Sequence, residues 1–205
     1  MLERFETIER GSEAEITEKK SIFIASIFPI IDEEDAINKL NEVRKKYRDA
    51  KHNVFAYRIA NGIERYSDDG EPSGTAGMPI LTILRGENLQ NILVVVTRYF
   101  GGILLGTGGL VHAYSDATKS AVAKLTKKEM RLHSQYKVTV NYELYQTIEY
   151  YCRVNNIKII NSVFLDVVVL EIIVKKEEEE NLVKKFVELS NGTALIDVVN
   201  SNFYA

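Results

Sequence analysis

The sequence predicts an α+β protein of two domains, which cover residues 1–133 and 134–205. Three observations support this prediction. Strand-like and helix-like hydrophobic patterns alternate along the first part, one strand is an almost unbroken run of Ile, Leu and Val, and the pattern restarts after a basic segment at 124–131. A chain of 205 residues is long enough for two domains, because domains most often have ~100 to 150 residues.

In the first domain, short strands alternate with amphipathic helices. Pro29 ends the first β-rich run, Asp32 precedes a segment with apolar residues at helical spacing, and Asn61-Gly62 is a strong hairpin-turn signal. Residues 92–97 are expected to form a strand that is covered on both faces. The predicted elements are strand 21–28, a helix after Asp32, strands 52–60 and 63–67, a loop from residue 68 to at least 73, helix 76–84, strand 92–97 and helix 110–125.

The second domain has a different order of elements. The predicted elements are strand 136–140, helix 144–155, strands 157–164 and 167–174, helix 177–189 and strand 193–199. This βαββαβ order is the ferredoxin-like supersecondary pattern, and about 65 residues can form a small domain of their own.

Composition restricts the class of protein. No apolar stretch approaches the ~20 residues of a membrane span, and the N-terminus lacks the order of a signal peptide, so we expect a cytoplasmic protein without a membrane partner. The formal net charge is -3, so nucleic-acid binding would require a local basic patch. The single cysteine, Cys152, rules out an internal disulfide and is expected to be a packed thiol.

The segment Arg98 to Gly109 contains five glycines between a predicted strand and a predicted helix. A helix N-terminus presents unpaired amides and a positive dipole end, which favours phosphate, carboxylate or sulfate, and Arg98 adds a permanently charged donor. The same glycines are equally consistent with tight turning and packing alone, since the segment matches neither a Walker loop nor a dinucleotide fingerprint. The candidate anion-binding residues are Arg98, Gly101, Gly102, Gly106, Thr107, Gly108 and Gly109.

A second candidate is the acidic loop that contains Asp68, Asp69, Glu71 and Ser73, followed by Thr75. Three carboxylates in four residues can hold Mg²⁺ or share acid and base roles. The favoured interpretation is a rigid turn in which the aspartates accept hydrogen bonds from nearby backbone amides.

A third candidate is the basic run at the end of the first predicted helix, which contains Arg44, Lys45, Lys46, Tyr47 and Arg48. The cations can contact RNA phosphates, and Tyr47 can stack on a base. More often, cations at a helix C-terminus only complement the helix dipole and remain solvated.

Other chemistry has little support in the sequence. His52, His112 and His133 are too scattered to suggest a zinc site, and no serine has the flanks of a nucleophile elbow. We expect no metal, no cofactor and no catalytic residue, so the sequence favours a binding protein over an enzyme.

Three motifs in order resemble the Impact/YigZ family: HNVFAY at 52–57, DDGEPSGTAG at 68–77, and RYFGGILLGTGG at 98–109 with the LVHAY that follows it. The resemblance is close over residues 15 to 125, and the βαββαβ tail resembles the C-terminal domain of bacterial members. His112 stands where a basic residue, often Arg, is expected, and we assign it to the same surface as the acidic loop.

The resemblance implies an N-terminal domain of the ribosomal protein S5 domain 2-like fold, with helices on one face of a mixed sheet, and a ferredoxin-like domain like domain V of elongation factor G. It implies a non-enzymatic translation-associated factor that binds ribosome or structured RNA. The eukaryotic relatives regulate translation in another domain context. The alternatives are a phosphate-handling or nucleotide-dependent enzyme that uses the glycine-rich segment, and a protein–protein interaction module. The oligomeric state does not follow from the sequence.

Overall fold

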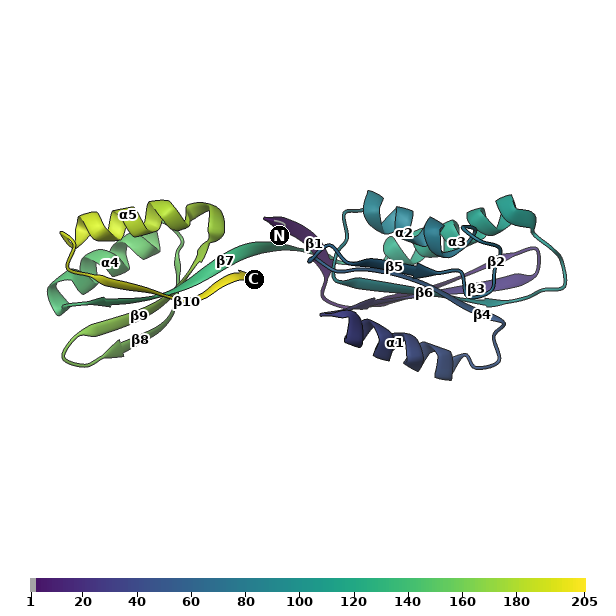
Figure 1. The fold of residues 1–205 in the computed structure, drawn as a ribbon, viewed down its shortest axis with the longest axis horizontal. Helices are drawn as coiled ribbons and strands as arrows, with labels where there is room; N and C mark the ends of the chain where they lie inside the picture. The colour runs from purple at the N-terminus through teal and green to yellow at the C-terminus, as the bar shows by residue number, and fades with distance from the viewer. Residues whose placement is uncertain (1–2) are drawn as a thin grey trace. The chain divides into compact units, whose positions relative to one another are not determined.

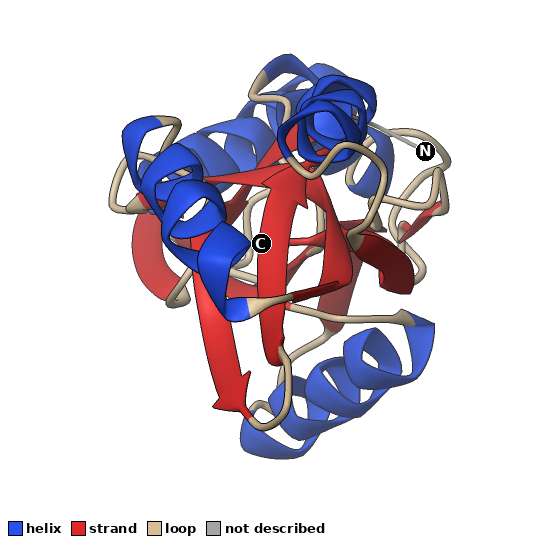
Figure 2. Cartoon of the chain, turned by 90° about the vertical axis from the view of Figure 1, so that its left-hand side faces the viewer, coloured by secondary structure: helices blue, strands red, loops and turns tan. Residues whose placement is uncertain are grey.

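The computed structural model describes residues 3–205 and divides the chain into two compact units, one ending at Glu129 and the other spanning Met130–Ala205. This division lies a few residues before the expected boundary at 133/134. Figure 2 shows that helices and strands make up most of the chain. No helix among the described residues is long and apolar enough to cross a membrane.

The first unit is built on a five-stranded sheet. Its strands, in spatial order, are β2 (Ser12–Glu18), β3 (Ser21–Pro29), β6 (Ile92–Tyr99), β4 (His52–Arg58) and β5 (Glu64–Ser67). All four neighbouring pairs are antiparallel, so the expected mixed sheet is wrong. β1 (Arg4–Ile8) and β2 were not predicted, because both segments are rich in charged residues.

Helices cover both faces of this sheet (Figure 1). α1 (Glu33–Lys46) packs on one face, and α2 (Gly77–Gly86) and α3 (Gly106–Val122) pack on the other. The expectation of helices on one face only is therefore wrong. β6 is covered on both sides as predicted, because Leu93 and Val95 belong to the core under α1, while its even-numbered residues Ile92, Val94 and Val96 belong to the core under α2 and α3.

The starts of two helices can be compared with their predicted positions. Asp32 caps α1, the helix that was predicted to follow it, and its Oδ1 accepts a hydrogen bond from the amide of Asp35 at 2.8 Å. α3 begins at Gly106, so the prediction that Gly106, Gly108 and Gly109 precede the helix is wrong. These three glycines form its first turn, because φ of +73° at Gly106 turns the chain directly into the helix.

The second unit has the predicted βαββαβ order. Its elements are β7 (Lys127–Val140), α4 (Tyr142–Val154), β8 (Lys158–Phe164), β9 (Val168–Lys175), a 3-10 turn (Lys176–Glu178), α5 (Glu179–Leu189) and β10 (Leu195–Tyr204). The sheet order is β10-β7-β9-β8 with antiparallel neighbours, and α4 and α5 cover one face (Figure 1). Cys152 is fully buried on α4, as predicted, and burial raises the pKa of its thiol to about 11.

Candidate functional site

The glycine-rich segment and the acidic loop meet at one pocket of about 460 Å³ in the first unit. Both motifs contribute to its wall, as does the start of β4. A pocket of this size lies within the ~300 to 1,000 Å³ typical of small-molecule sites. Its lining residues are Lys51, His52, Gly70, Glu71, Pro72, Arg98, Phe100, Leu104, Leu105, Gly106, Thr107 and Leu110.

The register of the sheet brings the pocket's polar side chains together. Arg98 on β6 is directly opposite His52 on β4 and opposite Phe23 on β3. Opposite residues of antiparallel strands project from the same face, so these three side chains form a row across the sheet. The Arg98 guanidinium carbon Cζ lies 5.4 Å from the centroid of the Phe23 ring, which supports the cation from below.

Glu71 is the centre of the polar network. Its Oε1 accepts hydrogen bonds from Nη1 of Arg98 at 2.5 Å and from the hydroxyl of Tyr114 at 2.8 Å, and it lies 3.9 Å from Nε2 of His52. Burial, together with the Glu71 carboxylate, raises the pKa of Tyr114, so the phenol remains a donor. The Glu71 carboxylate thus orients Arg98 and offsets part of the positive charge that the guanidinium brings to the pocket.

Arg98 retains unused hydrogen-bonding capacity. The residue is 6% exposed, and its Nε is the one buried side-chain nitrogen or oxygen without a hydrogen-bond partner in the part of the chain that the structure describes. A buried unpaired donor costs about 1–3 kcal/mol. A polar ligand group or a water molecule beside Arg98 would remove this cost.

The N-terminus of α3 adds a second feature suited to an anion. Its N-cap, Leu105, has no side chain that can accept a hydrogen bond, and its first turn contains no acidic residue. The first amides of a helix lack partners within the helix and lie at the positive end of its dipole. Gly106 and Thr107 line the pocket, so this helix end belongs to the site.

The other predicted glycines do not line the pocket. A Cβ at Gly101 would lie 2.0 Å from the carbonyl carbon of Lys20, so Gly101 is required for close packing of two backbone segments. A Cβ at Gly108 would meet nothing within 4 Å, and one at Gly109 would approach the side chain of Leu105. Gly102 has φ of +83° and serves the turn.

In the acidic loop, both aspartates bind backbone amides, in agreement with the favoured interpretation. Asp68 accepts hydrogen bonds from the amides of Gly74, Ala76 and Gly77 at 2.8 to 3.0 Å, which closes the start of α2. Asp69 accepts a 2.7 Å hydrogen bond from the amide of Asn53. Among the described residues, no group of three or more His, Cys, Asp or Glu side chains is arranged to hold a metal ion.

The remaining residues assigned to this surface lie outside the pocket. The Thr75 hydroxyl donates to the carbonyl oxygen of Pro72 at 2.6 Å, and Ser73 is exposed on the same loop. His112 is exposed on α3, and its side chain does not line the pocket.

The basic run divides into two groups. Arg44, Lys45 and Arg48 are exposed and line, with Asn41, an open hollow of about 490 Å³. The other two residues are engaged elsewhere, because Lys46 and the Tyr47 hydroxyl both donate to Oε2 of Glu13. The ion pair between Arg44 and Asp69, at 3.5 Å, connects the hollow to the loop that forms the pocket.

Four residues with polar or aromatic side chains in the pocket or its network were not among the candidate site residues from the sequence: Lys51, His52, Phe100 and Tyr114. His52 lies opposite Arg98 only because of the strand register, which no local pattern specifies. Its Nδ1–H donates to the carbonyl oxygen of Asp69 at 2.7 Å, since a carbonyl can only accept. Phe100 and Tyr114 both lie in the motifs that resemble the family, and this position was the sequence signal that could have identified them.

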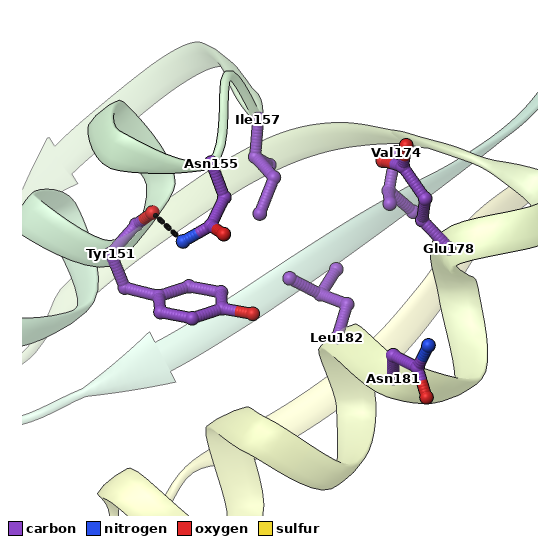
Figure 3. A pocket seen from close by; sticks show the side chains of 7 residues that line it. All are labelled: Tyr151, Asn155, Ile157, Val174, Glu178, Asn181 and Leu182. Carbon is purple, nitrogen blue, oxygen red and sulfur yellow. Dashed lines mark hydrogen bonds between the residues drawn. The ribbon is translucent and has the colours of Figure 1, made fainter.

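The second unit also contains a pocket, of about 300 Å³, between α4 and α5 (Figure 3). The Asn155 side chain donates to the carbonyl oxygen of Tyr151 at 2.9 Å, and Leu182 contributes an apolar wall. Glu178 is the only charged residue in its lining, which contains no lysine, arginine or histidine. This pocket is therefore less suited to an anion than the one at Arg98.

Comparisons with known proteins agree with the three motifs. Residues 19–122 match the model of the Impact N-terminal domain, and residues 138–193 match a domain of unknown function. The chain is 33% identical to IMPACT family member YvyE of Bacillus subtilis over 94% of this chain and 89% of the relative. It is 35% identical to IMPACT family member YigZ of Escherichia coli over 85% and 88%.

Two further matches cover about half of this chain and nearly all of it, respectively. Protein IMPACT of Oryctolagus cuniculus is 37% identical over 53% of this chain and 36% of its own length. A crystal structure of a hypothetical protein, 31% identical, covers 98% of this chain and 99% of its own with a TM-score of 0.67. Matches to both parts of the chain and to bacterial relatives over most of their length confirm the resemblance: the chain belongs to the IMPACT family.

Proposed function

We propose that this chain is a non-enzymatic, translation-associated factor that binds the ribosome or structured RNA through its first unit. The observation that carries the proposal is the pairing of an open hollow lined by Arg44, Lys45 and Arg48 with a pocket at Arg98. The ion pair between Arg44 and Asp69 joins the two. Because the chain has a net charge of -3, this local basic group is what would attract phosphates.

The non-enzymatic part of the proposal is supported by the carboxylates of the acidic loop. Asp68 and Asp69 accept hydrogen bonds from backbone amides, and Glu71 pairs with Arg98. These groups are already used to shape the loop and the pocket. We also propose cytoplasmic function, an S5 domain 2-like fold for the first unit and a ferredoxin-like fold for the second, like domain V of elongation factor G. The sheet order β10-β7-β9-β8 supports the second assignment.

Co-sedimentation with purified ribosomes at two salt concentrations tests the proposal. The wild-type protein should bind at low salt and dissociate at high salt, and the combined variant Arg44→Ala/Lys45→Ala/Arg48→Ala should lose most of this binding. A matched control with the same charge change replaces the exposed Lys119, Lys128 and Lys184 by Ala and should bind as the wild type does. Salt-independent binding, or equal losses in the two variants, would contradict the proposal.

A further inference from the structure

One wall of the pocket at Arg98 is apolar and contains an accessible aromatic ring. Phe100 is 45% exposed and Leu104 is 82% exposed, although both line the pocket. The Phe100 ring centroid lies 5.7 Å from Nζ of the exposed Lys51 and 5.6 Å from Cζ of Arg98. An accessible aromatic ring with cations beside it is the arrangement that stacks nucleic-acid bases and holds their phosphates.

The same lining also presents hydrogen-bond donors. The amides at the start of α3 have neither a side-chain cap nor an acidic neighbour in the first turn. The Nε of Arg98 is buried without a partner at the same pocket. Two independent features therefore favour an anionic group near Arg98 and the start of α3, and the exposed Lys51 adds a positive charge to the same lining.

Glu71 provides an acceptor in the same lining. Its Oε1 is shared by Arg98 and Tyr114, and the carboxylate lines the pocket. A ligand that enters the pocket can donate to this carboxylate. The pocket therefore suits a ligand with an anion at one end, a flat apolar body and at least one hydrogen-bond donor.

From these features we infer that the pocket binds one unpaired nucleotide of an RNA strand, with its base against Phe100 and its phosphate toward the start of α3. This inference rests on the proposed RNA-binding function and names the part of the RNA that the site selects. The volume of about 460 Å³ accommodates a single nucleotide. Bases in a duplex are stacked and cannot reach such a pocket, whereas bases in loops, bulges and ends can.

The basic hollow extends this site. Arg44 pairs with Asp69 of the acidic loop, Lys51 lines the pocket, and Lys45 and Arg48 line the hollow with Arg44. Phosphates that neighbour the bound nucleotide would contact these cations. The pocket supplies preference for an unpaired base, and the hollow supplies salt-dependent affinity.

Fluorescence anisotropy with full-length protein tests the inference. The probes are a labelled RNA hexamer of uridine, an abasic oligomer with the same number of phosphates, and a duplex RNA of equal length. The variants are Phe100→Ala and a matched control, Ile103→Ala, whose side chain is 42% exposed in the same segment but does not line the pocket. Thermal unfolding of each variant confirms that the fold is retained.

The wild-type protein and Ile103→Ala should bind the uridine hexamer at least about fivefold more tightly than the abasic oligomer, the effect expected of one stacked base. Phe100→Ala should lose this preference while keeping the affinity for the abasic oligomer. If Phe100→Ala retains the preference, or if duplex binds as well as hexamer, the inference is wrong while the RNA-binding proposal stands. If the wild-type protein binds none of the probes and no ribosomes, both are wrong.

Discussion

Nη1 of Arg98 donates a 2.5 Å hydrogen bond to Oε1 of Glu71, and the two side chains are only 7% and 4% exposed. The pair joins the end of a central strand to the acidic loop. Because both charges are shielded from water, each depends on the other for compensation. This dependence makes the pair both a structural element of the first unit and one side of its pocket.

Replacing Glu71 by Ala should therefore destabilise the protein by about 3–5 kcal/mol, because an uncompensated guanidinium remains buried. The double variant Glu71→Leu/Arg98→Met removes both charges and should be less destabilised than the single variant. Denaturant unfolding at neutral pH measures both. A loss below about 1 kcal/mol in Glu71→Ala would mean that Arg98 is solvated when its partner is removed.

Asp68→Ala should destabilise the first unit by about 1–2 kcal/mol. The substitution leaves the amides of Gly74, Ala76 and Gly77 without their acceptor at the start of α2. Asp68→Asn keeps one carbonyl oxygen and should cost less. The shift in the denaturant midpoint gives the stability change of each variant, provided that the slope of the transition is unchanged. Equal stability of the wild type and Asp68→Ala would show that water replaces the lost acceptor at no cost.

Two glycines of the same segment should respond oppositely to alanine. At Gly101 the added Cβ would overlap the backbone of Lys20, so Gly101→Ala should cost about 1–3 kcal/mol or more. At Gly108, in the first turn of α3, the added Cβ meets nothing within 4 Å, and alanine should stabilise the helix by up to about 1 kcal/mol. In thermal unfolding, the midpoint of Gly101→Ala should lie below that of the wild type and the midpoint of Gly108→Ala should lie above it. Equal shifts in one direction would disprove this assignment.

Cys152 should react slowly with thiol reagents in the folded protein. Burial, and to a lesser extent Glu149, raises the pKa of its thiol from 9.0 to about 11, which lowers the thiolate fraction at pH 8 by about 100-fold. A disulfide reagent at pH 8, with and without guanidinium, measures the difference. Rapid modification of the folded protein would show that α4 opens locally.

The same pKa gives a direction for stability at alkaline pH. The thiol of the unfolded chain ionises near its ordinary pKa of 9.0, whereas the pKa of the folded thiol is about 11. The contribution of Cys152 to stability is therefore complete below pH 9 and decreases as the pH rises from 9 toward 11. Cys152→Ala should lose less stability than the wild type over this interval. A steeper loss in the variant would contradict the shift.

The sequence predicted most helices and strands because their hydrophobic periodicity is local. Asp32, Pro29 and Asn61-Gly62 marked boundaries through side-chain chemistry that acts over a few residues. β1 and β2 were missed because both segments contain many charged residues and only a few buried apolar ones, so neither shows a clear strand pattern. The start of α3 was missed because glycines disfavour a helix, while the following residues and the packing of Leu110 and Tyr114 determine its presence.

The candidate site was predictable only in outline. Motif composition identified the two segments that meet at the pocket, but the partner of Arg98 depends on a contact across 27 positions of the chain. No periodicity distinguishes Glu71, which faces Arg98, from Asp68 and Asp69, which bind backbone amides. The roles of these three carboxylates depend on tertiary structure.

The row of Phe23, Arg98 and His52 spans the three innermost strands of the first sheet. These strands are covered on both faces, so this floor of the pocket is lost only when the sheet itself unfolds. A ligand held there is thermodynamically linked to global unfolding of the first unit rather than to loop opening. At 100 times its dissociation constant it would add about 2.7 kcal/mol to stability, so a melting-temperature screen of small anions and nucleotides would detect it.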